Sequence, residues 1–167
     1  IRLSSTPYEF SALDLEQYVK EYRPAEERTE EIHQEIQMIQ NAMGFKFVKL
    51  RDCKVPRTDI EAVEIDEKIE TLNSLFSQTG HSKIMIYKDT IDNLIGYVHA
   101  SDMFNKPENI MSVLRKVDIY PETMTANTLL NIFIINRKSL AVVVDEFGGT
   151  SGIITMEDII EEIFFYF

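Results

Sequence analysis

The chain has 167 residues, of which 44% are hydrophobic and 27% are charged, which is typical of one soluble globular domain or two small ones that share a core. Its 17 basic and 28 acidic residues give a formal net charge of −11. This charge argues against a general nucleic-acid binder and against a protein that docks on anionic lipid, although a local basic pocket for one phosphate ligand stays open. Cys53 is the only cysteine, which excludes a disulfide framework and a zinc site built from thiolates.

The sequence contains neither a membrane span nor a signal peptide, because no apolar run approaches the roughly 18 to 20 residues that a span requires. The chain begins at Ile1 and stops on the aromatic cluster Phe164–Phe167. Both ends therefore look cut from a longer protein. We expect the aromatic cluster to pack on the rest of the fold or on a second subunit.

The first 54 residues are predicted to be helical and acidic. Ser11 and Asp14 form a capping-box pattern, and apolar residues then recur at helical spacing over 15–22. A second apolar stripe over 32–43 ends at Gly44, a typical C-terminal stop. The acids of this region fit a solvated helix face, and an acidic binding site is the alternative.

From Val55 onward, short β-branched runs alternate with short helical patterns. We expect strands over 62–65, 84–87, 94–99, 117–120, 141–144 and 153–154, and helices over 69–76, 110–114, 129–134 and from Met156 onward. Residues 105–109 read as a linker.

An internal repeat organises this region. Ser82–Tyr87 aligns with Ser139–Val144, and Gly96–Asp102 aligns with Gly152–Asp158, about 56 residues further on. Each unit is too small to bury both faces of its sheet alone, so two units should pack together. We therefore predict an α/β (α+β) fold in which two β-α-β-β-α repeats, 55–108 and 109–167, form a pseudo-two-fold pair behind a helical connector, 1–54.

Four segments carry a resemblance to a known family: residues 55–60, 80–84, 143–152 and 155–163. They are similar to the tandem CBS-domain (Bateman) module of the CorC/HlyC family of hemolysin-like, CNNM-type membrane transporters. The similarity covers about residues 30–163, and residues 1–54 resemble the connector that leads from that family's membrane domain.

The resemblance implies a regulatory module that binds an adenine nucleotide (AMP, ADP or ATP), with Mg²⁺ through its phosphates as an option, between the repeats. It implies homodimers through CBS pairs, and a parent protein of magnesium and cobalt efflux whose transmembrane domain and C-terminal domain lie outside this chain. The module would lie on the cytoplasmic side of the bacterial inner membrane without inserting into it. It would bind no nucleic acid and hold no resident metal.

Thr155 and Asp158 are the first candidates for the nucleotide site. They follow a strand and open a helix, where a carboxylate can accept hydrogen bonds from both ribose hydroxyls and a hydroxyl can add a further contact. The same spacing is also an ordinary capping box. The resemblance places the ribose contact here, and both roles are compatible.

By the same resemblance, the ribose motif of one repeat faces the strands of the other. This places Thr58, Ile60 and Ala62, and then Ser82, Lys83 and Ile84, beside the nucleotide. Lys83 would contact phosphate where the family usually has arginine, and a lysine offers a point charge without the bidentate fork. An ordinary surface lysine is the alternative.

The first repeat has His99-x-x-Asp102 at the equivalent position, so the threonine hydroxyl is lost. We expect one competent site, with His99 packed at the strand end and Ser101 capping the helix. Arg57 could reach phosphate or pair with Asp59 or with an acidic helix, and we favour the structural role.

The glycine-rich stretch 148–152 lacks the Gly-Lys-Ser/Thr of a P-loop and is typical of a hairpin connection, with Asp145 and Glu146 solvated at its start. No catalytic constellation accompanies the three histidines. We therefore predict no enzymatic activity. The alternative function is a ligand-free dimerisation and coupling module of the same kind of membrane protein, of the type associated with gliding motility.

Overall fold

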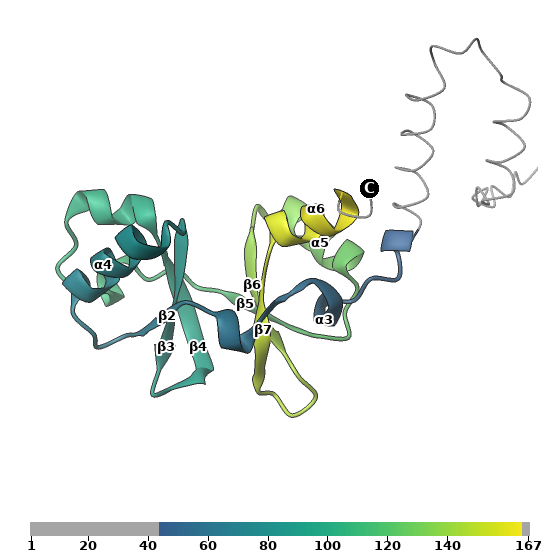
Figure 1. The fold of residues 1–167 in the computed structure, drawn as a ribbon, viewed down its shortest axis with the longest axis horizontal. Helices are drawn as coiled ribbons and strands as arrows, with labels where there is room; N and C mark the ends of the chain where they lie inside the picture. Colours follow the sequence, from purple (N-terminus) through teal and green to yellow (C-terminus); the bar gives the residue numbers. More distant parts are fainter. Residues whose placement is uncertain (1–43, 165–167) are drawn as a thin grey trace, which may run out of the picture.

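The structure is a computed structural model that describes residues 44–164, and it shows two lobes side by side, each a sheet with helices on its outer face (Figure 1). The first lobe contains β2 (Ala62–Glu64), α4 (Ile69–Thr79), β3 (Lys83–Lys88), β4 (Thr90–His99) and the 3₁₀ segments η3 (Ala100–Asn105) and η4 (Met111–Val113). The second contains β5 (Asp118–Pro121), α5 (Ala126–Asn136), β6 (Leu140–Val144), β7 (Thr150–Thr155) and α6 (Met156–Phe164). Ahead of both stand α3 (Leu50–Cys53), β1 (Val55–Pro56) and η2 (Arg57–Asp59).

The first sheet has the order β2-β3-β4, with β2 parallel and β4 antiparallel to β3. Helix α4 covers its outer face, because its buried residues Leu72 and Phe76 lie one turn apart on one side of the helix. Gly80 ends α4 in the left-handed conformation with φ 68° and donates its N–H to the carbonyl of Phe76. The core between α4 and the sheet is closed by Val63, Ile84, Ile86, Val98 and Ile110.

The second sheet has the order β1-β7-β6-β5, with β5 parallel and β7 antiparallel to β6. Its outer face carries α5 and α6, and Leu50 of α3 packs into the same core. Thr125 caps α5 by accepting the Thr128 N–H at 3.3 Å. The buried members of this core are Phe45, Leu50, Ala126, Leu129, Phe133, Ala141, Val143, Ile154 and Ile159.

A third hydrophobic cluster joins the two sheets. Met85 and Leu94 of the first sheet pack with Leu140 and Val142 of the second, and all four are at least 94% buried. Each repeat therefore buries the inner face of its sheet against the other repeat, as the repeat pattern predicts, and the mixed α+β fold with paired repeats is confirmed.

The two repeats also exchange their first extended segments. Val55 of β1 pairs with Ile153 of β7, so the strand that begins the first repeat lies at the edge of the second sheet. In the opposite direction, Arg115, which comes just before the first strand of the second repeat, β5, pairs with Tyr97 of β4 in the first sheet. Tyr97 and Arg115 exchange both backbone hydrogen bonds, at 2.9 and 2.8 Å. This exchange was not predicted.

Glycine is required where each exchanged segment crosses. A Cβ on Gly152 would lie 2.1 Å from the Val55 carbonyl oxygen, and a Cβ on Gly96 would lie 2.2 Å from the Arg115 carbonyl oxygen. Both distances are far inside van der Waals contact. The two glycines, which are equivalent in the repeat, thus serve the same purpose in both sheets.

An ion pair fixes the η2 segment behind β1. Arg57 donates a hydrogen bond to Asp92 of β4, and Asp92 also accepts the Thr150 N–H of β7 at 3.1 Å. The hydrogen bond from Arg57 and then the one from Thr150 lower the pKa of the Asp92 carboxyl. The structural role predicted for Arg57 is therefore confirmed, but its partner is Asp92 and not Asp59.

The predicted strands and the helices over 69–76, 129–134 and from 156 are all present, and the pattern over 110–114 is a 3₁₀ segment, η4.

Asp145 is not simply solvated: its carboxylate accepts the N–H groups of Phe147 and Gly149 at 2.9 and 3.0 Å and shapes the β6–β7 turn. The backbone at Gly44 is still helical, so the stop comes slightly later than predicted. The predicted helices over 11–22 and 32–43 and residues 165–167 lie outside the described residues. None of the helices within residues 44–164 is long and apolar enough to cross a membrane.

The close approach at Gly152 predicts that Gly152→Ala destabilises the protein by about 1–3 kcal/mol, because the added methyl group displaces β1 from β7. Urea denaturation followed by circular dichroism measures the change in unfolding free energy. Gly44→Ala is the control, since nothing lies within 4 Å of the position of its Cβ. Equal stability of the two variants would contradict the proposed packing at Gly152.

Candidate functional site

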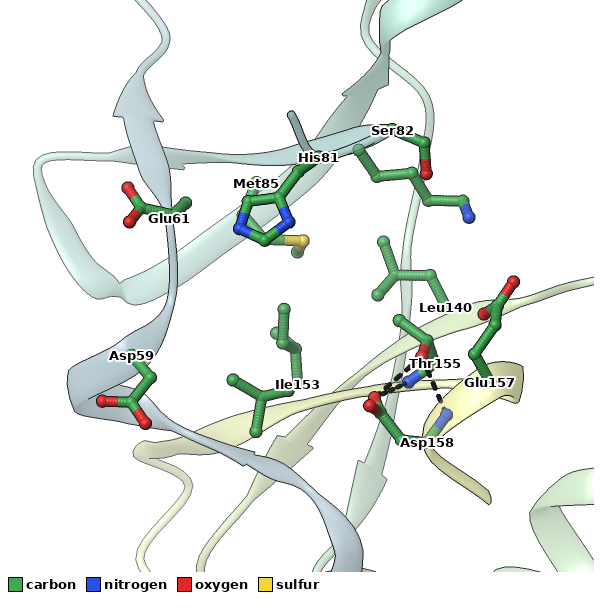
Figure 2. Close-up of a pocket in the computed structure, with 12 residues that line it drawn as sticks. Asp59, Glu61, His81, Ser82, Met85, Leu140, Ile153, Thr155, Glu157 and Asp158 are labelled. Carbon is green, nitrogen blue, oxygen red and sulfur yellow. Dashed lines mark hydrogen bonds between the residues drawn. The ribbon is translucent and has the colours of Figure 1, made fainter. Parts of the chain in front are cut away.

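A cavity of about 350 Å³ lies between the two repeats, where the exchanged strand β1 meets the inner faces of both sheets (Figure 2). Its walls come from η2 and the β1 strand, from the start of β3, and from the β7–α6 junction. The lining residues are Val55, Asp59, Glu61, His81, Ser82, Lys83, Met85, Leu140, Ile153, Thr155, Glu157 and Asp158.

Thr155 and Asp158 form one corner of the cavity at the start of α6 (Figure 2). The Asp158 Oδ2 accepts both the N–H and the hydroxyl of Thr155 at 2.8 Å, and the Asp158 N–H donates to the Thr155 hydroxyl at 3.2 Å. The two residues therefore form a capping box, one of the two roles expected for them. Within residues 44–164 the other carboxylate oxygen, Oδ1, accepts no hydrogen bond, which leaves it able to bind a ligand.

Ser82 and Lys83 lie on the opposite wall, as predicted, and Met85 continues it. Side chains alternate along a strand, so Lys83 and Met85 face the cavity while Ile84 faces the other way. Ile84 is fully buried in the core beneath α4. Of the eight predicted site residues, the structure therefore brings Ser82, Lys83, Thr155 and Asp158 together, and it places the Ile84 side chain elsewhere.

Residues 58–62, which run from the end of η2 to the start of β2, are also divided between the cavity and the core. Asp59 and Glu61 line it, whereas Ile60 and Ala62 pack into the cluster that joins the two sheets. Thr58 is exposed and donates its hydroxyl to Asp59 at 3.2 Å. The predicted segment thus borders the cavity, but through Asp59 and Glu61 and not through Thr58, Ile60 and Ala62.

The cavity carries an excess of negative charge. Asp59, Glu61, Glu157 and Asp158 line it, against a single lysine, Lys83, and one histidine, His81. Groups of three or more side chains able to hold a metal ion do not occur among residues 44–164. The cavity therefore suits a polar ligand that offers hydroxyl donors and brings its own cation if it is strongly anionic.

Cys53 lies just behind the cavity, before β1. Burial, followed by the negative charges of Glu162 and Asp158, raises the pKa of its thiol to about 12. The thiol is therefore protonated at neutral pH and is a poor nucleophile or metal ligand.

The equivalent position in the first repeat has a different set of contacts. Asp102 accepts two hydrogen bonds from the Arg115 guanidinium, at 3.0 Å from Nε and 2.7 Å from Nη2. This pair lowers the pKa of the Asp102 carboxyl and raises that of Arg115. His99 itself caps η3, since its Nδ1 accepts the Ser101 N–H at 3.1 Å, which corrects the expectation that Ser101 would be the cap.

Comparison with known proteins gives a consistent family. A CBS-domain family model matches residues 110–164. The chain is 33% identical over 132 residues to a hemolysin C homolog from Rickettsia massiliae (strain Mtu5), covering 75% of this chain and 44% of that protein. It is 33% identical over 133 residues to the magnesium and cobalt efflux protein CorC from Pasteurella multocida (strain Pm70), covering 76% and 44%. The chain thus spans less than half the length of these curated relatives.

Solved structures agree. The CBS domain of a bacterial CNNM/CorC family Mg²⁺ transporter in complex with ATP has a TM-score of 0.75 and 31% identity, over 78% of this chain and 97% of that one. A CBS-domain pair with bound AMP from Klebsiella pneumoniae has a TM-score of 0.61 and 29% identity, over 70% and 98%. On the paired repeats, the cavity between them and these similarities, the chain belongs to the CBS-domain modules of the CNNM/CorC (hemolysin C-like) transporter family.

Proposed function

We propose that this chain is the regulatory CBS-pair module of a CorC/HlyC-type membrane protein of magnesium and cobalt efflux, and that it binds an adenine nucleotide between its repeats. In this proposal it is a sensor and not an enzyme. The parent protein's membrane domain anchors it at the cytoplasmic side of the bacterial inner membrane, where nucleotide binding changes how the module acts on that domain.

One observation carries the proposal: the cavity brings the Thr155–Asp158 corner of the second repeat opposite Lys83 of the first. The free Oδ1 of Asp158 supplies an acceptor for ribose hydroxyls, and the ammonium group of Lys83 supplies a partner for phosphate. Related CBS domains of known structure are complexes with ATP and with AMP. A nucleotide that spans both walls would couple the two repeats.

The charge of the cavity determines the form in which the nucleotide binds. Four carboxylates repel a bare triphosphate, and Lys83 offsets only one of them. Mg²⁺ is held through one or two carboxylates together with phosphate oxygens and waters, so a magnesium-bound ATP reduces the repulsion. AMP carries less charge and needs the ion less.

The module is also proposed to form homodimers through its helices. Ile134 and Ile135 of α5 are 60% and 78% exposed, and Ile160 of the neighbouring α6 is 38% exposed. These exposed isoleucines lie on two helices that contact each other, and we propose that they form one apolar patch that a second copy covers. A ligand-free coupling module, which is the alternative function, would dimerise through the same patch. The two functions therefore differ in the use of the cavity and not in the use of this surface.

Nucleotide binding is expected to raise the thermal stability of the protein. Because ATP carries more negative charge than AMP, its stabilising effect should depend more strongly on Mg²⁺. Ligand at 100 times its dissociation constant adds about 2.7 kcal/mol to the unfolding free energy. Asp158→Asn keeps an acceptor for the helix cap but loses the charged acceptor for ribose, so affinity should fall about 10-fold or more. Thermal denaturation with AMP and with ATP, each with and without Mg²⁺, measures the change in stability, and isothermal titration calorimetry with AMP and Mg-ATP measures the affinity.

Glu161→Gln is the matched control, because it removes the same charge from an exposed position of α6 that does not line the cavity. It should bind at least as well as the unchanged protein. Absence of any shift at millimolar nucleotide would overturn nucleotide binding and leave the coupling module. Unchanged affinity in Asp158→Asn would overturn the assignment of the site.

Dimerisation is tested with Ile135→Glu, which places a charge in the apolar patch. Light scattering after size exclusion should show the mass of a dimer for the unchanged protein and of a monomer for the variant. Met111→Glu is the control, since Met111 is 63% exposed on η4 of the other lobe. A monomer in all three samples would contradict the proposed surface.

A further inference from the structure

The exchanged segments reveal which residues of the two repeats are equivalent in space. Val55 pairs with Ile153 one strand position from Gly152, and Arg115 pairs with Tyr97 one position from Gly96. The carbonyl oxygen of each exchanged residue lies against the equivalent glycine, at 2.1 and 2.2 Å from the position of a Cβ. Arg115 is therefore the pseudo-two-fold counterpart of Val55.

The side chains of Val55 and Arg115 differ in whether they can bind the nearby carboxylate. Val55 lines the same cavity as Asp158, and its apolar side chain cannot hydrogen-bond to that carboxylate. Arg115 reaches the equivalent carboxylate, Asp102, and holds it with two hydrogen bonds. A planar guanidinium that meets a carboxylate side by side forms the strongest ion-pair geometry available to a side chain.

Both oxygens of Asp102 are consequently in use. Oδ2 accepts the Arg115 Nε–H at 3.0 Å and Oδ1 accepts the Nη2–H at 2.7 Å, whereas Oδ1 of Asp158 has no hydrogen-bond partner within residues 44–164. The Asp102 side chain is 20% exposed, so water competes only in part for the pair. A ribose at Asp102 would have to displace the guanidinium first.

The hydroxyl that accompanies Asp158 is also missing beside Asp102. His99 stands in place of Thr155, and its Nδ1 is engaged with the N–H of Ser101 at 3.1 Å and with the Ser101 hydroxyl at 2.7 Å. The first repeat thus retains a carboxylate at this place, but both of its oxygens and the Nδ1 of His99 already have partners within the protein.

We propose that Arg115 is an internal plug: its guanidinium occupies the carboxylate of Asp102, which would otherwise bind the ribose of a second nucleotide. Replacing His99 and Arg115 by their counterparts from the second repeat, threonine and valine, opens that second site. This rests on the proposed function, because the ligand class is taken from the cavity at Asp158. Arg115 is thus a specificity-determining residue that limits each chain to one nucleotide.

The test is the number of AMP molecules bound per chain, measured by isothermal titration calorimetry. The variant His99→Thr/Arg115→Val copies Thr155 and Val55 into the first repeat. The unchanged protein should bind one AMP and the variant two. His99→Thr/Lys116→Val is the matched control, since it removes a neighbouring exposed cation that holds no described carboxylate, and it should still bind one.

Circular dichroism checks that each variant is folded. If the double variant does not fold, His99→Thr/Arg115→Met replaces it, because methionine keeps an unbranched apolar stem in the same space. An independent measurement is the titration of the Asp102 carboxyl by NMR. Its pKa should be below the ordinary value in the unchanged protein and should rise in either Arg115 variant.

The outcomes separate the two proposals. One AMP in both the unchanged protein and the folded variant overturns the plug and leaves the proposed function intact. No AMP in the unchanged protein but one in the variant overturns the site at Asp158 and supports the plug. Two AMP molecules in the unchanged protein, or none in either protein, overturns the plug, and so does an Asp102 pKa that is unchanged by loss of Arg115.

Discussion

The close contact of each repeat's glycine with the other repeat's backbone is the constraint on which this structure depends. Gly152 allows the Val55 carbonyl to lie against β7, and Gly96 allows the Arg115 carbonyl to lie against β4. Because of these contacts, each sheet is completed by a segment that belongs to the other repeat. The shared cluster around Met85 and Leu140 then follows, since the inner faces of the sheets are already held together.

The same exchange builds the cavity. Strand β1 brings Val55 to the wall beside Asp158, and η2, which is held by the Arg57–Asp92 pair, carries Asp59 to the opposite side. The lining residues thus come from four stretches of the sequence, 55–61, 81–85, Leu140 and 153–158. Their acidic side chains concentrate part of the chain's net charge of −11 at one place, which is the ground for proposing that a strongly anionic ligand binds there together with a cation.

Pseudo-symmetry explains why two similar motifs have different chemistry. Asp102 and Asp158 occupy equivalent places after β4 and β7, but two counterpart residues differ: Arg115 stands where the second site has Val55, and His99 where it has Thr155. In the proposed plug, the guanidinium of Arg115 and a ribose compete for the same acceptor. The carboxylate without such a partner, that of Asp158, is the one proposed to bind the nucleotide.

Much of the fold could be predicted from local patterns. The alternation of β-branched runs and helical stripes indicated the strands and helices, and the repeat indicated that two units share a core. The site was predicted in part. Ser82, Lys83, Thr155 and Asp158 line the cavity as candidate residues. In the segment before β2, however, Asp59 and Glu61 line it, and the predicted Ile60 and Ala62 do not. One step along an extended chain reverses the direction of the side chain, and the sequence shows the alternation without showing which face is inward.

The repeat, the family resemblance, the Thr155–Asp158 motif and the excess of acids can all be recognised in the amino-acid sequence, because each is a local pattern or a matter of composition. The strand exchange, the acidic wall of the cavity, and the pairing of Arg57 with Asp92 and of Arg115 with Asp102 become visible only in the folded protein. These depend on how whole sheets are placed against each other. Strand β1 has only two residues, and Arg115 pairs with Tyr97 through a single bridge. Segments this short show too little local sequence pattern for their partners to be predicted.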